Sequence, residues 1–165
     1  MTRGPLYEFF RRDHARLDEL LHRADEGATI DRESYESFRG GLLRHIAMEE
    51  KVLLPEARRL RGGEPFASAK LMRADHAALA ALLVPSPTHD LIARIREVLL
   101  EHNPLEEDPG GLYETCEQLA GDGVAALLAR VQAVPQVAVA RHLDGPRTFR
   151  GIDNLLRARR LAREG

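Results

Sequence analysis

The stretch MRADHAALAALL, from Met72 to Leu83, combines the composition of a good helix with one polar residue on its apolar side. It holds five alanines and three leucines, and neither glycine nor proline interrupts it. His76 shares a face with Met72 and Leu79, because spacings of three and four residues return to the same side of a helix. A polar group on a buried face costs free energy unless it is paired. The stretch therefore predicts a buried helix whose histidine needs a partner.

Two short internal repeats extend this pattern to the rest of the chain. RRDHARLDELL, at residues 11–21, shares the sequence D-H-A-x-L-x-x-L-L with the stretch around His76. HIAMEE, at residues 45–50, likewise matches HNPLEE at residues 102–107. The order of the repeats suggests a bundle built from two similar helical hairpins.

Four segments have the alternating spacing of helices that are buried along one side. They cover residues 6–24, 31–60 and 65–84, and a fourth segment begins near Thr88. Asp31 is expected to cap the second helix and Gly62-Gly63 to end it, while Pro55 either kinks this helix or ends it early. Short connections between amphipathic helices predict an all-α fold, an antiparallel up-down four-helix bundle with a C-terminal extension.

The bundle is expected to occupy residues 1–132 as one domain, followed by a basic extension over residues 133–165. A fifth helical segment, residues 112–131, follows a break at residues 108–111. The extension carries seven arginines against three acidic residues, so its net charge is +4 in a chain of net charge −2. It is expected to be irregular at first and then to form a short basic helix at residues 149–165.

The composition is that of a globular protein with a sizeable core. At 165 residues and a net charge of −2, the chain shows no sign of a nucleic-acid partner. No apolar run reaches the ~20 residues that span a bilayer, and the N-terminus lacks a signal-peptide pattern. Cys116 is the single cysteine, so an intramolecular disulfide is impossible. We therefore expect a cytoplasmic protein that contacts neither nucleic acid nor membrane. Motifs of hydrolases, P-loops and dinucleotide sites are also missing.

Side chains that bind metals interrupt all four apolar stripes. Each helix contributes a histidine, and two helices add a glutamate four residues later, on the same face. The set comprises His14, His45, Glu49, His76, His102 and Glu106. Any one of these histidines alone is more often a core residue hydrogen-bonded to backbone. Two carboxylates and four imidazoles in one core are costly without partners, and a pair of iron, zinc or copper ions satisfies them directly.

Residues beside these candidates receive other assignments. Asp13 and Asp75 precede ligand candidates but face another way, which predicts positions on the helix surface. Glu50 and Glu107 are turned by about 100° from the glutamates before them, so they are expected to be solvated or to contact the ligands from outside. Tyr7 and Tyr113 could line the cavity of the site, but packing in the core is the expected role of both.

The motifs DHARLDELL, HIAMEEKVLLP, DHAALAALL and HNPLEEDPGGLY resemble those of the hemerythrin-like family, also called the HHE cation-binding domain. The resemblance covers residues 6 to about 120. It implies an up-down four-helix bundle around a non-haem di-iron centre, in which two carboxylates and an oxo or hydroxo group bridge the irons. Members of the family bind dioxygen reversibly, sense oxygen or iron, or act in oxidative and nitrosative stress.

Carried over by position, the resemblance implies four imidazole ligands and two bridging carboxylates, namely His14, His45, His76 and His102 with Glu49 and Glu106. Oxygen-carrying members have a fifth histidine, in an H-x-x-x-H pair on the third helix. Met72 and Ala80 stand at the two corresponding positions here, so a coordination position is left to water, another residue or a ligand. This favours sensing or redox chemistry over oxygen transport. Pro104 lies between His102 and Glu106, which makes their pairing the least regular part of the site.

Two functions follow from these expectations. The first is a di-iron protein, with zinc or manganese as alternative metals, that binds or senses dioxygen, another small diatomic molecule, peroxide or iron itself. Redox activity toward reactive oxygen or nitrogen species is compatible with it. The second is a regulatory module that the metal stabilises, in which the basic extension contacts a protein partner. The alternative for the extension is that it has no partner and packs, solvated, on the acidic bundle. A third interpretation of the whole chain is a helical interaction protein that binds no metal.

Overall fold

The computed structural model describes residues 3–165, and helices are the regular structure of this range, with no strand in it. The elements are α1 (Pro5–Asp25), α2 (Arg32–Met48), the π-helix η1 (Glu49–Leu53), α3 (Leu54–Leu60), α4 (Ala69–Leu82), α5 (His89–Glu107), α6 (Leu112–Ala120), the 3-10 turn η2 (Gly121–Gly123), α7 (Val124–Gln132) and α8 (Pro146–Glu164). This confirms the all-α class that the sequence predicts. Across the described residues, every helix is too short or too polar to cross a membrane.

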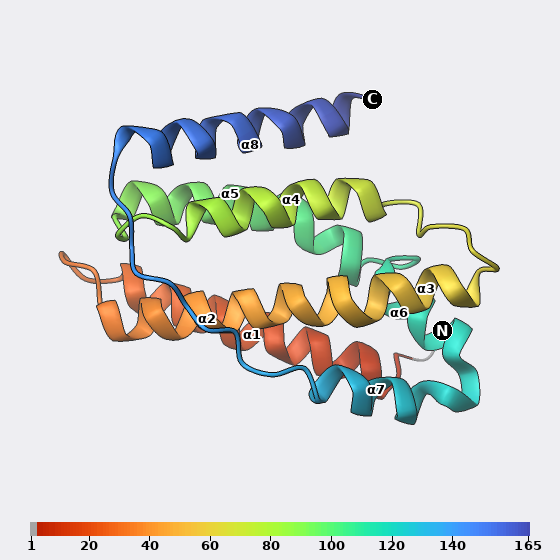
Figure 1. Cartoon of the computed structure of the whole chain (residues 1–165). Coiled ribbons are helices and arrows are strands. Elements are labelled where there is room, and N and C mark those ends of the chain that lie inside the picture. The colour runs from red at the N-terminus through yellow and green to blue at the C-terminus, as the bar shows by residue number, and fades with distance from the viewer. Residues whose placement is uncertain (1–2) are drawn as a thin grey trace.

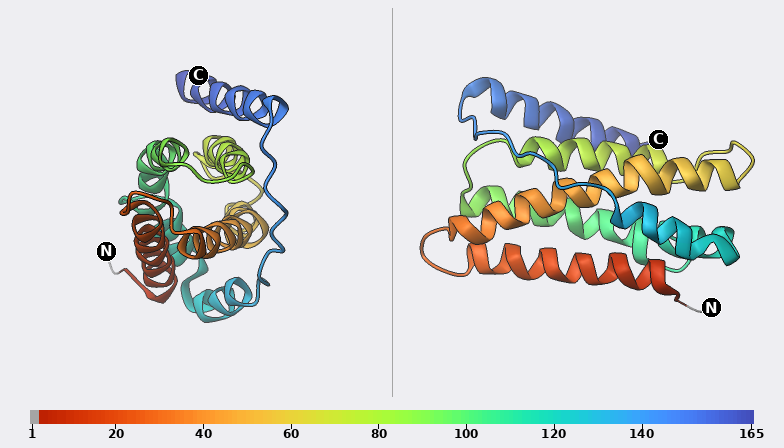
Figure 2. Two further views of the ribbon diagram at one scale, coloured as in Figure 1. Left: turned by 90° about the vertical axis from the view of Figure 1, so that its left-hand side faces the viewer. Right: turned by 60° about the horizontal axis from the view of Figure 1, so that its bottom comes forward.

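The helices α1, α2, α4 and α5 form the centre of the molecule. Figure 1 shows that successive members of this group run in opposite directions, and the end-on view in Figure 2 shows them around a common axis. Each helix turns its apolar stripe inward: Phe10 and Leu21 of α1 are buried, as are Ile92 and Ile95 of α5. Burial of these stripes is the main favourable contribution to helix packing.

The second predicted helix, residues 31–60, is continuous but is not α-helical throughout. The chain passes from α2 into the π-helix η1 at Glu49 and returns to an α-helix as α3. The wider π turn precedes Pro55, whose ring would collide with the carbonyl of Lys51 in a regular α-helix. Pro55 therefore does not end the helix. The chain accommodates the proline by a π-helical segment that begins at Glu49, one of the predicted metal ligands.

Side chains cap two helices, one of them at Asp31 as the sequence predicts. The Asp31 side chain accepts a hydrogen bond from the backbone amide of Ser34 at 3.3 Å. The Thr88 side chain accepts one from the backbone amide of Leu91 at 3.1 Å. Each bond satisfies an amide that has no partner within its own helix.

The third helix is shorter than the predicted residues 65–84. Gly62 and Gly63 end α3 as expected, and their φ values of 71° and 99° lie in the left-handed region that glycine adopts easily. A non-helical segment follows, and α4 begins only at Ala69. Phe66 of this segment is buried in the core, so tertiary packing rather than local propensity decides where α4 begins.

The helix α5 contains a proline in its interior. Pro104 lies between His102 and Glu106, where the sequence predicts the least regular pairing. The helix nevertheless continues to Glu107, and His102 Nε2 lies 2.6 Å from Glu106 Oε1. Pro104 removes a hydrogen bond to the carbonyl of Leu100, which lies at an exposed position where water can replace it. The proline therefore does not separate the two side chains.

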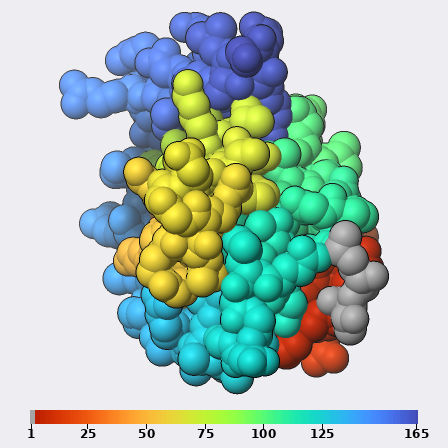
Figure 3. All heavy atoms as spheres, turned by 90° about the vertical axis from the view of Figure 1, so that its right-hand side faces the viewer, coloured from red at the N-terminus to blue at the C-terminus, as the bar shows by residue number. Residues whose placement is uncertain are grey.

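A tight turn at residues 108–111 connects α5 to α6. Gly110 has a φ of 81°, and a Cβ atom at Gly111 would lie 2.6 Å from the Glu106 carbonyl oxygen. Both positions therefore require glycine. The turn reverses the chain, and α6, η2 and α7 fill the predicted helical segment of residues 112–131. Figure 3 shows them closing this end of the molecule beside the segment that precedes α4.

Residues 133–145 cross the bundle as an irregular strap and lead to α8. Arg44 of α2 donates a hydrogen bond to the carbonyl of Val134 at 2.9 Å, and Arg39 donates one to the carbonyl of Ala140 at 2.7 Å. The views in Figure 2 show α8 on the outside of α4. Ile152 of α8 is buried there. The strap and α8 therefore pack on the bundle, and α8 begins three residues earlier than predicted.

Two hydrophobic clusters fill the interior. The α6 cluster includes Leu6, Phe10, Met48, Met72, Leu112 and Tyr113, and the α8 cluster includes Leu17, Leu42, Leu79, Ile95 and Ile152. The helices α1, α2 and α4 contribute to both clusters, which meet halfway along these helices. His14, His45 and His76 lie at this boundary, each between a residue of one cluster and a residue of the other.

Candidate metal centre

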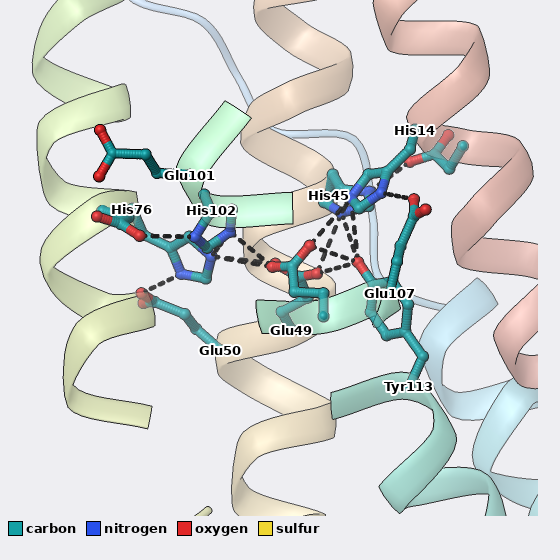
Figure 4. A network of polar contacts seen from close by, with 12 residues as sticks. His14, His45, Glu49, Glu50, His76, Glu101, His102, Glu107 and Tyr113 are labelled. Carbon is teal, nitrogen blue, oxygen red and sulfur yellow. Dashed lines mark hydrogen bonds and ion pairs between the residues drawn. The ribbon is translucent and has the colours of Figure 1, made fainter. Parts of the chain in front are cut away.

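The six side chains that interrupt the apolar stripes converge at the boundary between the two clusters (Figure 4). They form two groups of four potential donors, the His14 group (His14, His45, Glu49 and Glu106) and the His76 group (His76, His102, Glu49 and Glu106). The donor atoms of each group lie within 4.8 Å of one another. The structure thus brings together all six residues singled out in the sequence, and each group could hold one metal ion.

Glu49 and Glu106 belong to both groups because each divides its two oxygens between them. Glu49 Oε1 lies 3.1 Å from His45 Nε2, and Glu49 Oε2 lies 3.1 Å from His76 Nε2. Glu106 is placed in the same way: its Oε2 lies 3.0 Å from His14 Nε2, and its Oε1 lies 2.6 Å from His102 Nε2. Carboxylates placed in this way can bridge two cations.

Burial leaves two of these carboxylate oxygens without hydrogen bonds of good geometry. The side chains of Glu49 and Glu106 are fully buried. Glu49 Oε2 and Glu106 Oε1, which face the His76 group, make no hydrogen bond of good geometry, and their neighbours there are the Nε2 atoms of His76 at 3.1 Å and of His102 at 2.6 Å. An ionised oxygen in this position is costly unless a cation balances it. Imidazole nitrogen and carboxylate oxygen are good ligands for iron, zinc and manganese, so this donor set fits a pair of such ions.

Each imidazole turns Nε2 toward the centre and Nδ1 toward a carboxylate outside it. Asp13 accepts the Nδ1 hydrogen bond of His45 at 2.8 Å, and Asp75 accepts that of His102 at 3.0 Å. The expectation that both aspartates lie on the helix surface is therefore wrong. Each aspartate faces away from the histidine that follows it in the sequence. It points to the other helix of its hairpin, where it meets the histidine of that helix.

Glu50 and Glu107 make the corresponding contacts between the hairpins. Glu50 accepts the Nδ1 hydrogen bond of His76 at 2.9 Å, and Glu107 accepts that of His14. Glu50 and Glu107 stand at equivalent positions of the two repeated motifs, and they therefore contact equivalent histidines, His76 and His14. An Nδ1–H donated to a carboxylate leaves the Nε2 lone pair free for a metal and keeps the ring oriented toward it.

Tyr113 enters the same centre, which the sequence offers only as the alternative to core packing. Its hydroxyl oxygen lies 2.5 Å from Glu49 Oε1 and 2.9 Å from Glu106 Oε2. It also lies 3.1 Å from the Nε2 atoms of both His14 and His45. The residue comes from α6, and only the direction of the sharp turn after α5 brings it here. The ring of Tyr113 packs in the core as expected, whereas its hydroxyl contacts the polar side chains of the centre.

Carboxylates hold protons on the imidazoles when no metal is bound. Burial alone would lower the pKa of His14, but hydrogen bonds to Glu106 and Glu107 outweigh it and raise this pKa to about 10. The same balance raises the pKa of His76 to about 11 and that of His102 to about 9. Burial opposes ionisation of Glu106, yet the neighbouring imidazoles lower its pKa well below its usual value. A metal ion must therefore displace protons to bind.

We expect the metal-free protein to lose stability as the pH rises above neutral. The pKa values of His14, His76 and His102 are about 10, 11 and 9 in the folded state, against ~6.5 in an unfolded chain. Their contribution to folding is complete below pH ~6.5 and is lost as the pH rises through the folded values. Thermal unfolding of chelator-treated protein at about pH 6.5 and about pH 9.5 should show a melting temperature several degrees lower at the higher pH. Metal-loaded protein is the control, because its ligand imidazoles are already neutral. A metal-free melting temperature that rises over this range would contradict the assignment.

The helix α8 reaches the outer side of the His76 group. Arg159 Nε and Arg163 Nη2 donate to Asp75 at 2.8 Å and 2.7 Å. Asp75 is fully buried and also accepts the hydrogen bond from an imidazole of the centre. Its counterpart Asp13 is instead contacted by Arg16, whose side chain is 51% exposed. The two groups thus have the same kinds of potential donor in different surroundings, and two arginines of the basic extension have partners within the chain.

A cavity of about 20 Å³ adjoins the centre on the side of the α8 cluster. Its lining includes His14, His45, Glu49 and His102 from the centre and Leu17, Leu42, Leu79 and Leu99 from the apolar surroundings. This volume holds about one water-sized molecule. A molecule of about this size can therefore lie against the donor groups.

The comparison with protein families agrees with the resemblance seen in the sequence. The family model described as Hemerythrin HHE cation binding domain matches residues 6–109. The match includes all six residues of the two groups and ends before Tyr113 and α8, which lie outside it. No curated protein and no solved structure matches the chain.

Proposed function

The chain belongs to the hemerythrin HHE cation-binding domain family, and from this premise we propose that it is a non-haem di-iron protein for a small ligand such as dioxygen. The His14 group would hold one iron and the His76 group the other, with Glu49 and Glu106 as bridges. The helices α1, α2, α4 and α5 would be the antiparallel four-helix bundle that carries them.

The observation that carries this proposal is the division of two buried carboxylates between four imidazoles. Each glutamate presents one oxygen to each donor group, and the only polar neighbours of the two oxygens on the His76 side, among the described residues, are imidazole nitrogens of that group. A metal-free protein has no evident reason to bury such a pair in its core, since a well-packed apolar core is commonly as stable or more stable. Two cations would satisfy every one of these atoms.

Iron in the two groups would supply a reversible change of redox state and a coordination position for a small ligand. The residues of the chain orient the imidazoles through their Nδ1 hydrogen bonds and exclude bulk water from the centre. The cavity of about 20 Å³ supports a diatomic molecule or peroxide as the ligand. Met72 is fully buried and supplies no nitrogen donor at the position of a fifth histidine. We therefore propose sensing or redox chemistry rather than oxygen transport.

Metal analysis tests this proposal. Protein purified from an iron-replete host should contain about two iron ions per chain, and the His45→Ala variant should contain less than half of that. Exposure of the reduced iron form to dioxygen or peroxide should change its near-ultraviolet absorption. His22→Ala is the matched control, because His22 lies on the same helix as His14 with an exposed side chain. Wild-type protein with less than one transition metal per chain, and no difference in His45→Ala, would rule the proposal out.

A second candidate is a regulatory module in which the metal centre controls the C-terminal extension. The favouring observation is Asp75, which joins an imidazole of the His76 group to Arg159 and Arg163 of α8. Metal loading and docking of α8 would then influence each other, and the exposed Arg150 and Arg157 would offer a basic surface to an acidic partner.

A further inference from the structure

Tyr113 contacts every donor of one metal group. Its hydroxyl oxygen lies 2.5 Å and 2.9 Å from oxygens of Glu49 and Glu106, and 3.1 Å from the Nε2 atoms of His14 and His45. Figure 4 shows the ring entering the centre from α6 with the hydroxyl directed at these atoms. Among the interactions of residues 3–165, none joins this hydroxyl to an imidazole of the His76 group.

The distances have the spacing of donor atoms around a single cation. Donors that lie ~2.1 Å from a metal and at right angles to one another are ~3.0 Å apart. His14 Nε2 lies 3.0 Å from His45 Nε2 and 3.0 Å from Glu106 Oε2. His45 Nε2 lies 3.1 Å from Glu49 Oε1. Three neighbouring pairs of these donors thus have the spacing of atoms around one cation, and the Tyr113 oxygen lies within 3.1 Å of all four donors.

The surrounding structure holds the ring in this position. The turn at residues 108–111 places Tyr113 only two residues after its last glycine, Gly111, whose close approach to Glu106 leaves no room for a side chain. The Tyr113 ring stacks on Phe10 at 4.5 Å between centroids, and Tyr7 packs against it edge-on at 6.3 Å. The hydroxyl therefore points to the His14 group because the ring has little freedom to move.

Hydrogen bonds account for the position of Tyr113 in the metal-free protein, where its hydroxyl can donate to Glu49 or Glu106 and accept from the imidazoles. A phenol donates one hydrogen bond and accepts two. Protonated Nε2 atoms of His14 and His45 can donate to it in the metal-free protein. A metal ion in the His14 group replaces both protons, so the fully buried oxygen would then face two nitrogens that no longer donate. A bond from this oxygen to the metal would replace the two hydrogen bonds that the imidazoles no longer donate.

We propose that Tyr113 is the fifth protein ligand of the metal in the His14 group, bound as a phenolate after its proton leaves to water. This assignment rests on the proposed function. It makes the two metal positions unequal, with five protein donors at one and four at the other. Tyr113 belongs to the α6 cluster, whereas the cavity is lined by the α8 cluster. The small ligand would therefore approach from the side that Tyr113 leaves free.

Absorption and resonance Raman spectra of the ferric protein test this assignment. A phenolate bound to ferric iron gives a visible charge-transfer band, and excitation in that band enhances vibrations of the tyrosine ring. The wild-type protein should show both signals. Tyr113→Phe should lose both while it keeps its iron, because four donors of the His14 group remain. The chain has three tyrosines, so Tyr7→Phe and Tyr35→Phe are matched controls that should keep both signals.

The outcomes separate this assignment from the proposed function. Iron-loaded wild-type protein without a tyrosinate signal would overturn the assignment alone, as would a signal that survives in Tyr113→Phe. A chain that binds no iron would overturn the proposed function and the assignment with it. Should Tyr113→Phe fail to fold, as judged by circular dichroism, the controls still decide. A tyrosinate signal present in both Tyr7→Phe and Tyr35→Phe belongs to Tyr113, and one lost in either variant belongs elsewhere.

Discussion

Glu49→Gln is expected to release metal from both groups at once. Glu49 presents Oε1 to His45 and Oε2 to His76, so each group loses one of its carboxylate donors in the variant. An amide of the same size is a weaker ligand for iron and carries no charge to balance the two cations. The loss of affinity should exceed the ~10–100-fold that is typical for residues that only hydrogen-bond to ligands. Iron per chain after dialysis against a mild chelator measures it.

Glu50→Gln is the matched control for this prediction. Glu50 follows Glu49 directly but contacts only the outer nitrogen of His76, at 2.9 Å. Its replacement should reduce affinity by at most the ~10–100-fold of such contacts and leave the same iron content at saturation. Both variants should keep the helical circular dichroism of the parent. Equal loss of iron in the two variants would contradict the bridging role of Glu49.

Asp75→Asn is expected to destabilise the metal-free protein by about 3–5 kcal/mol, because it removes the shared partner of a buried network. Arg159, Arg163 and His102 all donate to this carboxylate. Their hydrogen bonds outweigh the effect of burial and hold the pKa of Asp75 well below its usual range. The contribution is therefore present at neutral pH and is lost as the pH falls into the acid range. Urea unfolding monitored by circular dichroism measures the change in free energy.

Asp13→Asn provides the comparison at the equivalent position of the other hairpin. Asp13 orients His45 as Asp75 orients His102, but its arginine partner, Arg16, is half exposed. We expect it to lower metal affinity by a similar factor and to cost only ~1 kcal/mol of stability, since exposed ion pairs contribute little. Limited proteolysis should cut the strap at residues 133–145 faster in Asp75→Asn alone. Equal stabilities of the two variants would show that the contacts with α8 contribute nothing.

The chemistry of the centre could be predicted from the sequence because it depends on local periodicity. His45 and Glu49 share a face whatever the helix packs against, as do His102 and Glu106, and the apolar residues around them show which face is buried. Even Pro55 and Pro104 did not disturb the pairs. In one case a π turn absorbs the proline, and in the other the lost hydrogen bond belongs to an exposed carbonyl.

The partners of the ligands could not be predicted in the same way. Asp13 and Asp75 face neighbouring helices, so their roles depend on the rotation of one helix against another. Three tyrosines and several aromatic residues are equally compatible with a core, and Tyr113 is distinguished only by the turn that precedes it. The pair Gly110-Gly111 was the available signal, because two adjacent glycines after a helix indicate a close reversal of the chain.

By itself, the sequence determined which side chains can bind metal and on which helical face each of them lies, because these properties follow from residue type and spacing. The tertiary structure alone decided which carboxylate holds which imidazole, that α8 joins the network through Asp75, and that Tyr113 stands over the His14 group. These depend on helix rotation, on the packing of segments far apart in the chain and on the direction of a single turn. None of these features is visible as a periodic pattern in the amino-acid sequence.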